Sequence, residues 1–393
     1  LTAGISRAAK INRILLPAVL QWLGEGQNPD MGLLNWRKLE ENFGSESGYL
    51  GFLRDSPSAA QRLCHVLSNS RFGDALNKSV ESVTWLGNDD SLQPRSRESL
   101  DIQTKATLER NAGNINDFAN SIRAMRRHEI ERIGLAWMSG VIDDEASLAG
   151  MTDVYDAAIE ASLQWAIQHR INDIQIDEAP AAIAIIGMGR YGGREVNFSS
   201  DADVIIIYRP AEGADDDQAN LFARKVQEDL RAILQGPTTF EPKIELDMDL
   251  RPEGKNGPLV RSYASCEEYY RSWASTWEHQ ALLRARYAAG DASLAEDFLM
   301  NIADPLRYPK IDLTETQIAE IRKLKARMEA ERLPRGVRRD RHLKLGKGGL
   351  SDVEWTIQLL QLQHAGDNAN LRVNGTLQAL NELEHRKLIS AGD

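Results

Sequence analysis

The stretch IIGMGRYGGREVNFSSDADVIIIYRP, from Ile185 to Pro210, decides the fold that we predict for this chain. Two apolar runs with the composition of buried strands flank a glycine-rich turn. Asp201 and Asp203 stand where the second run begins. Because side chains alternate along a strand, carboxylates two positions apart point to the same side. The stretch therefore predicts a strand, a tight turn and a second strand that starts at a pair of carboxylates.

The turn allows two interpretations. Gly187, Gly189 and Gly192 fit the G-x-G-x-x-G pattern of a dinucleotide-binding turn. That pattern needs a βαβ unit whose second strand ends at an acidic residue about 20 residues further on, whereas here the next strand follows almost at once. A D-x-D pair favours a divalent-cation site, although an isolated pair can simply cap a loop. The diglycine, the D-x-D and a later acidic strand together favour the metal site.

A third carboxylate is expected from the run IELDMDLRP, which alternates like a half-buried strand. Asp247 and Asp249 share one face of it, so the spacing leaves both candidates open. Magnesium prefers carboxylate oxygens together with substrate phosphates and water. In a two-metal site one ion binds the attacking oxygen and the other binds the leaving phosphate oxygens. We therefore expect Mg²⁺ at Asp201, at Asp203 and at one of these two aspartates.

Other residues of the region are candidates for binding a nucleotide. Gly192 and Gly193 are expected to leave backbone N–H groups free to approach a triphosphate at the start of a helix. Ser199 and Ser200 offer hydroxyl or amide donors. Arg251 either contacts phosphates or neutralises the acidic strand, since arginine suits both roles.

The pattern of the whole chain predicts three regions: helices over residues 1–177, an α/β catalytic unit over 178–297 and a helical bundle over 298–393. In the catalytic unit we expect an amphipathic helix in DDDQANLFARKVQEDLRAILQG and a strand pair formed by 243–252 and 257–262. Residues 266–290 keep aromatic and leucine residues at helical spacing. They are expected to be helical, with Trp273 and Trp277 in the core rather than acting as base-stacking platforms.

Composition limits the classes of function. An apolar share of 42 % is typical of a globular protein, and a net charge of −11 argues against a broad nucleic-acid surface. Cys64 and Cys266 form neither a disulfide framework nor a zinc cluster and indicate reduced, buried thiols in a cytoplasmic protein. The pattern contains neither a membrane-spanning run nor a signal peptide. Because the chain begins at Leu1 rather than at methionine, we expect it to be part of a longer protein.

Four motifs occur in the order of a known family. GMGRYGGREVNFSSDADV resembles the nucleotidyltransferase signature of the glutamine synthetase adenylyltransferases, members of the polymerase-β-like superfamily. DLRPEGKNGPLVRS, TWEHQALLRAR and KLGKGGLSDVEWTIQLLQL are similar to further signatures of that family, and the similarity covers essentially the whole chain. The resemblance implies an α+β fold. A mixed-sheet, polymerase-β-like nucleotidyltransferase domain would be flanked by N-terminal helices and by a C-terminal helical bundle that is cut short here.

The resemblance also implies an activity. Members of the family are bifunctional: one half transfers AMP from ATP to a tyrosine of glutamine synthetase, and the other removes it by phosphorolysis. With one nucleotidyltransferase unit, this chain resembles one half, and ARMEAERLPRG and GGLSDVEWT look most like the C-terminal, adenylylating half of high-GC Gram-positive versions. NFSSD instead resembles the deadenylylating halves. The alternatives are therefore the reverse reaction and a module that senses nucleotide or a PII-type protein without catalysis.

The resemblance assigns roles and partners. Asp201 and Asp203 match the metal-binding D-x-D, and Asp247 matches the third carboxylate, because family members often have arginine where Asp249 stands. The diglycine at 192–193 matches the phosphate-facing turn. The implied cofactor is Mg²⁺ and the implied substrate is ATP. Glutamine synthetase is the implied partner, with a PII-type signal protein for the full-length enzyme and with neither a nucleic acid nor a membrane.

The most basic stretch of the chain runs from residue 332 to residue 347. Its RRDR part, residues 338–341, is interpreted as a solvated loop. Lys344 and Lys347 lie in a signature of the family together with Asp352 and Glu354, so the resemblance implies a role for them in the active site or between domains.

Overall fold

Residues 6–43, 47–69, 72, 73, 76, 79–238, 241–333 and 336–390 are described by a computed structural model. The chain divides into two compact units. The first consists of Leu1–Gln103 and Ala124–Val154, and the second consists of Thr104–Arg123 and Tyr155–Asp393. The three-part division that we expected, with boundaries after residues 177 and 297, stays a prediction.

The described part of the first unit is built from helices. Its elements are α1 (Arg7–Gly24), α2 (Pro29–Phe43), α3 (Ser47–Asp55), α4 (Pro57–Leu67), α6 (Val80–Trp85) and α7 (Asp89–Leu92). Three further helices contribute residues to both units: α8 (Arg97–Arg110), α9 (Ile115–Met138) and α10 (Asp144–Asp173). In α1 the side chains of Ile11, Leu15, Val19 and Leu23 are buried. Their spacing of four residues is that of one apolar face of a helix.

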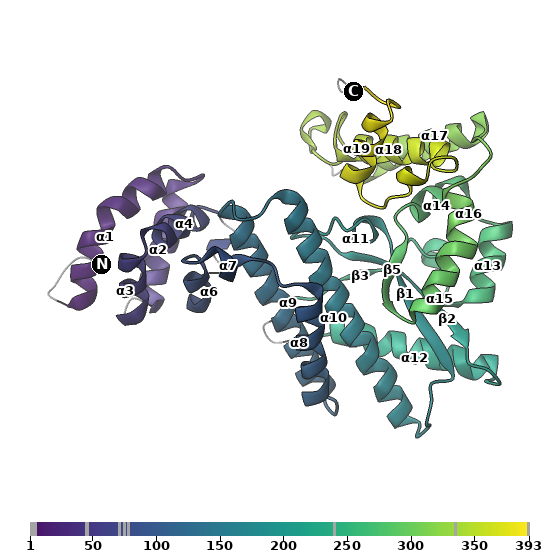
Figure 1. Ribbon diagram of the computed structural model, residues 1–393, viewed down its shortest axis with the longest axis horizontal. Helices are drawn as coiled ribbons and strands as arrows, with labels where there is room; N and C mark the ends of the chain where they lie inside the picture. The colour runs from purple at the N-terminus through teal and green to yellow at the C-terminus, as the bar shows by residue number, and fades with distance from the viewer. Residues whose placement is uncertain are drawn as a thin grey trace. The chain divides into compact units, whose positions relative to one another are not determined.

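The second unit contains one mixed sheet of five strands (Figure 1). Its strands are β1 (Ala181–Gly187), β2 (Ala202–Pro210), β3 (Leu246–Asp247), β4 (Val260–Ser262) and β5 (Arg286–Gly290). The order is β3-β2-β1-β5, and β4 also pairs with β2. β1 is antiparallel to both β2 and β5, whereas β3 and β4 are parallel to β2. Since a dinucleotide-binding βαβ unit needs parallel strands, the antiparallel β1–β2 pair excludes that interpretation of the glycines. It confirms the predicted α+β class.

Helices cover both faces of the sheet. The predicted amphipathic helix is α12 (Asp216–Gln235), which begins where Asp215 accepts a hydrogen bond from the N–H of Gln218. Asn220 of α12 donates to the hydroxyl of Tyr208 at 2.8 Å, so α12 covers the face to which Tyr208 points. The opposite face is covered by α13 (Tyr263–Ser272), α15 (Ala292–Asp297) and the π-helical turn η2 (Phe298–Ala303).

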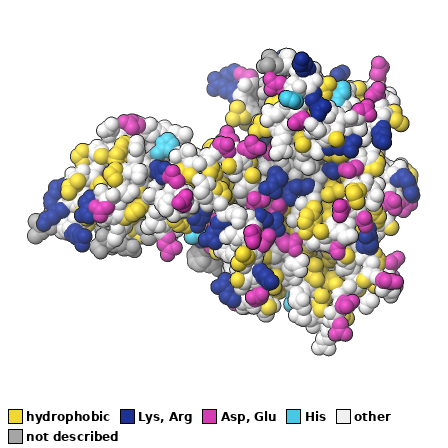
Figure 2. All heavy atoms as spheres, in the orientation of Figure 1, with side chains coloured by type: hydrophobic (Ala, Val, Ile, Leu, Met, Phe, Trp, Pro, Cys, Tyr) yellow, Lys and Arg dark blue, Asp and Glu magenta, His cyan; other side chains and the backbone are white. Residues whose placement is uncertain are grey.

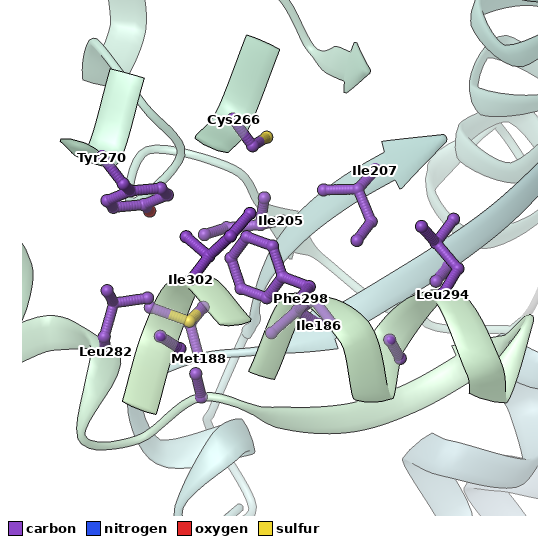
Figure 3. Close-up of a cluster of buried hydrophobic side chains, with 14 residues drawn as sticks. Ile186, Met188, Ile205, Ile207, Cys266, Tyr270, Leu282, Leu294, Phe298 and Ile302 are labelled. Atoms are coloured by element: carbon purple, nitrogen blue, oxygen red, sulfur yellow. The ribbon is translucent and has the colours of Figure 1, made fainter. Parts of the chain in front are cut away.

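The core beneath α13, α15 and η2 lies next to the glycine turn. Ile186 of β1 and Ile205 of β2 are cross-strand neighbours and point into it, together with Met188 at the start of the turn (Figure 3). Phe298 and Ile302 close it from the helical side. Both strands are thus anchored within a few residues of Asp201 and Asp203.

Two expectations about the secondary structure of this unit are wrong. Residues 243–252 and 257–262 do not form a strand pair, because β3 and β4 both pair with β2, at Ala202–Asp203 and at Ile206–Tyr208. Residues 266–290 are not one helical region. They contain the end of α13, then α14 (Thr276–Leu282), and finally β5.

The break before α14 has a local cause. Ser275 and Glu278 form a capping box, in which each side chain accepts a hydrogen bond from the backbone of the other. Trp273, just before that box, is 75 % exposed, so its assignment to the core is also wrong. The β5 strand ends at Gly290, whose φ of +88° favours glycine and ends the pairing with β1.

The C-terminal part of the second unit is helical. Its helices are α16 (Asp304–Arg307), α17 (Glu315–Arg332), α18 (Leu350–His364) and α19 (Thr376–His385). The 3₁₀ turns η3 (Arg339–Arg341) and η4 (Ala369–Leu371) lie between these helices, and η1 (Gly254–Asn256) lies in the β3–β4 loop. Leu283, Ile321, Ile357, Leu371 and Leu383 belong to its buried cluster.

Glu195 and Arg284 join α19 to the glycine turn. The Glu195 carboxylate accepts hydrogen bonds from the N–H and the hydroxyl of Thr376, the latter at 2.9 Å. Arg284 pairs with Glu195 at 3.4 Å and also donates to the Asn374 carbonyl oxygen and to the Thr376 hydroxyl.

Cys64 and Cys266 are free and buried, as predicted, and burial raises the pKa of each thiol to about 12. Within the described residues, no helix is both long enough and apolar enough to span a membrane.

Candidate active site

The turn after β1 brings the backbone against a carboxylate. A single helical turn, α11 (Gly189–Gly192), follows β1. Gly189 has a φ of +52°, in the left-handed region that favours glycine, and a Cβ there would lie 2.1 Å from Oδ2 of Asp203. The N–H of Met188 donates to the carbonyl oxygen of Asp203 at 2.8 Å. Asp203 can lie against the turn because residue 189 has no side chain.

The next two glycines serve the packing of the turn. The N–H of Gly192 donates to the Met188 carbonyl oxygen at 2.6 Å, and the N–H of Gly193 donates to that of Gly189 at 3.0 Å. A Cβ on Gly192 would lie 2.1 Å from the carbonyl oxygen of Arg284. The sequence predicts that these two amides are free, whereas in the structure both donate hydrogen bonds within the turn. A contact of Gly192 or Gly193 with phosphate stays a prediction.

Three carboxylates gather where β2 begins. Asp203 is the partner of Asp247 in the parallel pairing of β2 with β3, and Asp201 lies two residues before Asp203. Asp201 is exposed, whereas Asp203 and Asp247 are half-buried. Burial, followed by the negative charges of Asp201 and Asp247, raises the pKa of Asp203 to about 7. A bound proton or a bound cation therefore stabilises such a cluster.

Asp249, the other candidate from the acidic strand, has a different partner. Its carboxylate pairs with Nζ of Lys255 at 3.1 Å, and its N–H donates to Oδ1 of Asp247 at 2.7 Å. Spacing alone leaves Asp247 and Asp249 equivalent. The register of β2 with β3 distinguishes them, because it puts Asp247 beside Asp203.

The residues before Asp201 form a small hydrogen-bonded turn. Asn197 accepts at Oδ1 from the N–H of Ser199 at 2.9 Å, and its own N–H donates to Oγ of Ser200 at 3.0 Å. The hydroxyl of Tyr155 donates to the carbonyl oxygen of Ser200 at 3.0 Å. These contacts set the direction in which the chain enters β2, and a donor role of the two serines toward a nucleotide stays a prediction.

Arg251 holds the loop between β3 and β4 together. Its side chain is buried, and its guanidinium donates to the carbonyl oxygens of Met248, Lys255 and Gly257 over 2.7 to 3.2 Å. Arg251 also lines the cleft beside the carboxylates, and a contact of its guanidinium with phosphate stays a prediction. The guanidinium satisfies three carbonyl groups that a tight loop leaves without backbone partners.

Two basic residues act on the carboxylate cluster. The charges of Lys344 and Arg190 lower the pKa of Asp203, against the effect of burial and of the other carboxylates. Arg190 lies in α11 and pairs with Glu354 of α18 at 3.4 Å. Arg190 was missed from the sequence, where the available signal was its place directly after Gly189 of the turn.

Asp352 fixes the position of the segment that carries Lys344. Oδ2 of Asp352 accepts a hydrogen bond from the N–H of Gly348 at 2.6 Å, and its carboxylate also pairs with Lys325 of α17. Upstream, Arg338 is 66 % exposed and pairs with Asp340, which fits the interpretation of residues 338–341 as a solvated loop. The side chain of Arg339 lies outside the described residues.

Two cavities adjoin the cluster. An open cleft of about 510 Å³ is lined by Asp201, Asp247 and Asp249 and by the basic residues Arg231, Arg251 and Lys255. A second cavity of about 480 Å³ begins at Gly189 and continues along α14, α17 and α18. On the face drawn in Figure 2, acidic side chains lie among basic ones.

The chemistry of the three carboxylates fits a hard divalent cation, which takes oxygen ligands. Asp203 and Asp247 are partners in the pairing of β2 with β3, and the charges of Asp201 and Asp247 both raise the pKa of Asp203. Within the described residues, however, no group of three or more His, Cys, Asp or Glu side chains is arranged so that it could hold a metal ion as it stands. The carboxylates would therefore have to turn toward a cation on binding.

A mixed sheet in which a glycine turn leads into a D-x-D strand defines a nucleotidyltransferase-like domain. A model of the glutamate-ammonia ligase adenylyltransferase family matches residues 60–301, which is more than half of the chain. The chain belongs to this family. Residues 321–393 match a second family model, described as GlnD PII-uridylyltransferase.

Curated relatives carry one name, bifunctional glutamine synthetase adenylyltransferase/adenylyl-removing enzyme. The protein from Bifidobacterium longum strain DJO10A is 79 % identical over the whole chain. Those from Cutibacterium acnes and Mycobacterium tuberculosis are 46 % and 43 % identical over 97 % and 95 % of the chain. The chain spans 37 to 38 % of the length of these relatives.

Proposed function

We propose that this chain transfers AMP from ATP to a tyrosine hydroxyl of glutamine synthetase. The observation that carries the proposal is the register of β2 with β3, which puts Asp203 opposite Asp247 and beside the glycine turn. The names of the relatives support the choice of reaction and of target. Because the chain spans little more than a third of those relatives, its activity and the direction of transfer are both part of the proposal.

The proposed reaction is an in-line displacement. The tyrosine oxygen forms a bond to the α-phosphorus of ATP while the bond from that phosphorus to the leaving pyrophosphate oxygen breaks. A tyrosine hydroxyl has an ordinary pKa of about 10, so its proton needs an acceptor near neutral pH. We assign that role to Asp247, which lines the open cleft where a protein side chain can enter.

Asp201, Asp203 and Asp247 are the residues that would hold Mg²⁺. When bound, the ion supplies positive charge to the phosphate oxygens and to the attacking oxygen. Lys344 and Arg190 supply further positive charge at the same place, as their effect on the pKa of Asp203 indicates. We assign both to the phosphate oxygens of the nucleotide, where cationic donors stabilise the charge that develops on the leaving group.

The same site could run in the opposite direction, with phosphate as the attacking group and ADP as the product. The motif NFSSD, residues 197–201, favours this alternative by its resemblance to deadenylylating halves. We further propose that a PII-type signal protein regulates the full-length enzyme. The match of residues 321–393 to a PII-uridylyltransferase family supports that proposal.

The test uses the 393-residue chain, Mg²⁺, unmodified glutamine synthetase and ATP labelled in the α-phosphate. The expected result is label on a tyrosine of the synthetase, lost in the Asp201→Asn/Asp203→Asn double variant while circular dichroism shows a retained fold. Phosphate-dependent release of label from premodified synthetase, without forward transfer, would establish the reverse reaction. If neither reaction occurs, or if transfer survives the double change, the proposal is wrong.

A further inference from the structure

The cavity that begins at Gly189 has the composition of a small-molecule site. Its volume of about 480 Å³ is within the range of ligand pockets, which combine apolar and aromatic walls with a few polar groups. The apolar and aromatic part of its lining consists of Leu250, Trp277, Ala281, Leu324, Met328 and Trp355. These side chains come from the β3–β4 loop, α14, α17 and α18, so the cavity lies where the sheet domain meets the C-terminal helices.

Gln280 provides an unpaired polar atom among these residues. It lines the cavity from α14 and is 3 % exposed. Its Nε2 donates to Oε1 of Gln358 at 2.8 Å, and Gln358 also lines the cavity. No described residue donates a hydrogen bond to Oε1 of Gln280. A buried carbonyl oxygen without a donor is unfavourable. This atom has almost no accessible surface, so the Gln280 amide has to turn toward the cavity before a ligand there can donate to it.

The cavity is continuous with the carboxylate cluster through one residue. Gly189 belongs to the lining of the cavity, and Oδ2 of Asp203 lies against Gly189. A ligand whose flat apolar part occupies the cavity can therefore extend past Gly189 to the carboxylates. Arg327 and Arg332 of α17 also line the cavity, which suits a ligand with an anionic part.

We propose that this cavity binds the adenine base of the nucleotide and that Oε1 of Gln280 accepts a hydrogen bond from the 6-amino group. Adenine has the flat apolar faces that Trp277 and Trp355 can contact, and it carries an N–H donor at position 6. Guanine carries an oxygen there, which would face Oε1 of Gln280 and leave it without a donor. The bond from Nε2 of Gln280 to Gln358 occupies one end of the amide and leaves Oε1 as the end available to the base.

This inference rests on the proposed function, because it assigns a place to the base of the nucleotide that the reaction consumes. It also goes beyond that function, since it names a specificity-determining residue outside the carboxylate cluster. Gln280 acts here through a hydrogen bond to the base and takes no part in the chemical step.

The test compares two nucleotides that differ only at position 6: ATP, and purine riboside 5′-triphosphate, which lacks the amino group. Dissociation constants are measured by calorimetry in Mg²⁺ for the unchanged chain, for Gln280→Leu and for Gln168→Leu. Gln168 is an exposed residue of α10 and provides the matched control. Retained folding is checked by thermal unfolding.

The unchanged chain and Gln168→Leu should bind ATP about tenfold more tightly than the analogue, and Gln280→Leu should bind both with nearly equal affinity. Equal binding of the two nucleotides by the unchanged chain would overturn the proposal. So would a preference for ATP that persists in Gln280→Leu. If that variant fails to fold, Ala281→Leu provides a second test, because a larger side chain from the same helix would fill the cavity and should weaken the binding of both nucleotides.

The proposed function can fail separately. If the chain prefers ATP through Gln280 but never modifies glutamine synthetase, the adenine site stands and the assigned reaction is wrong. If it modifies the synthetase while binding both nucleotides equally, the reaction stands and the adenine site is wrong.

Discussion

Oδ2 of Asp203 lies against the backbone of Gly189, so closely that a Cβ at position 189 would come within 2.1 Å of it. The contact joins the glycine turn to Asp203, a half-buried carboxylate at the start of β2. A methyl group at position 189 would push this carboxylate away from its place, and it would also strain a backbone with a φ of +52°.

We therefore expect Gly189→Ala to abolish AMP transfer. The matched control is Gly213→Ala, because Gly213 has a φ of +77° with open space around its Cβ position. Both changes should cost about 1 kcal/mol of stability from backbone strain, and only the first should also lose activity. Transfer assays and thermal unfolding of the two variants separate the effects. Full activity in Gly189→Ala would show that the contact with Asp203 does not matter.

The third carboxylate can be identified with a pair of neighbouring variants. Asp247→Asn should lower kcat by at least about 100-fold, because it removes the proposed proton acceptor and cation ligand. Asp249→Asn should change kcat only a few fold, since its carboxylate pairs with Lys255. Steady-state kinetics with labelled ATP measure both. A larger loss in Asp249→Asn than in Asp247→Asn would reverse the assignment.

The raised pKa of Asp203 predicts how stability depends on pH without divalent cations. The pKa is about 7 in the folded chain against an ordinary 3.8, so the folded state binds the proton more tightly. Asp203 therefore has no adverse effect below about pH 4, and it lowers the free energy of unfolding as pH rises toward 7. Asp203→Asn should remove this loss and be more stable at pH 8, by on the order of a few kcal/mol.

Thermal unfolding between pH 4 and pH 8, with chelator and then with Mg²⁺, checks this prediction. Mg²⁺ should raise the Tm of the unchanged chain at pH 8 and have a smaller effect on Asp203→Asn. A variant that is less stable than the unchanged chain throughout this pH range would contradict the cause assigned to the pKa of Asp203.

Lys344 is expected to bind phosphate. Lys344→Met should weaken the binding of ATP about tenfold or more, because a charged donor near the cluster is lost. Lys323→Met, at an exposed position of α17, is the control and should bind ATP normally. Calorimetry with ATP and with adenosine completes the experiment, since adenosine has no phosphate and should bind both variants alike. Equal losses for ATP and adenosine would exclude a phosphate contact.

The elements with strong periodicity could be predicted from the sequence. The isoleucine-rich runs of β1 and β2 have the composition of buried strands, and the apolar face of α12 follows the helical repeat. The predicted α+β class is confirmed. β5 was missed because its sequence, RYAAG, is short and alanine-rich and continues a helical spacing. It forms a strand because its backbone pairs with β1. This contact is long-range, and local sequence propensity does not indicate it.

The candidate site was predictable only where residue types carry the chemistry. Asp201 and Asp203 stand out as a D-x-D before a strand, but the choice of Asp247 over Asp249 depends on the register with β2. Arg251 shows the reverse case. An arginine beside acidic residues suggests a phosphate contact, which stays a prediction, but its spacing does not indicate the carbonyl oxygens to which it donates in the fold. Their placement depends on a loop whose shape is not evident from the order of residues.

The hydrogen bonds of Glu195 to Thr376 restrict where this chain can be shortened. A version that ends before residue 374 would leave Glu195 and Arg284, two charged groups beside the glycine turn, without their partners from residues 374–376. Loss of activity on such trimming would then reflect a disturbed turn rather than the removal of a separate regulatory segment. Anyone who designs a minimal catalytic fragment should therefore keep the last helix, even though it lies far along the chain from every proposed catalytic residue.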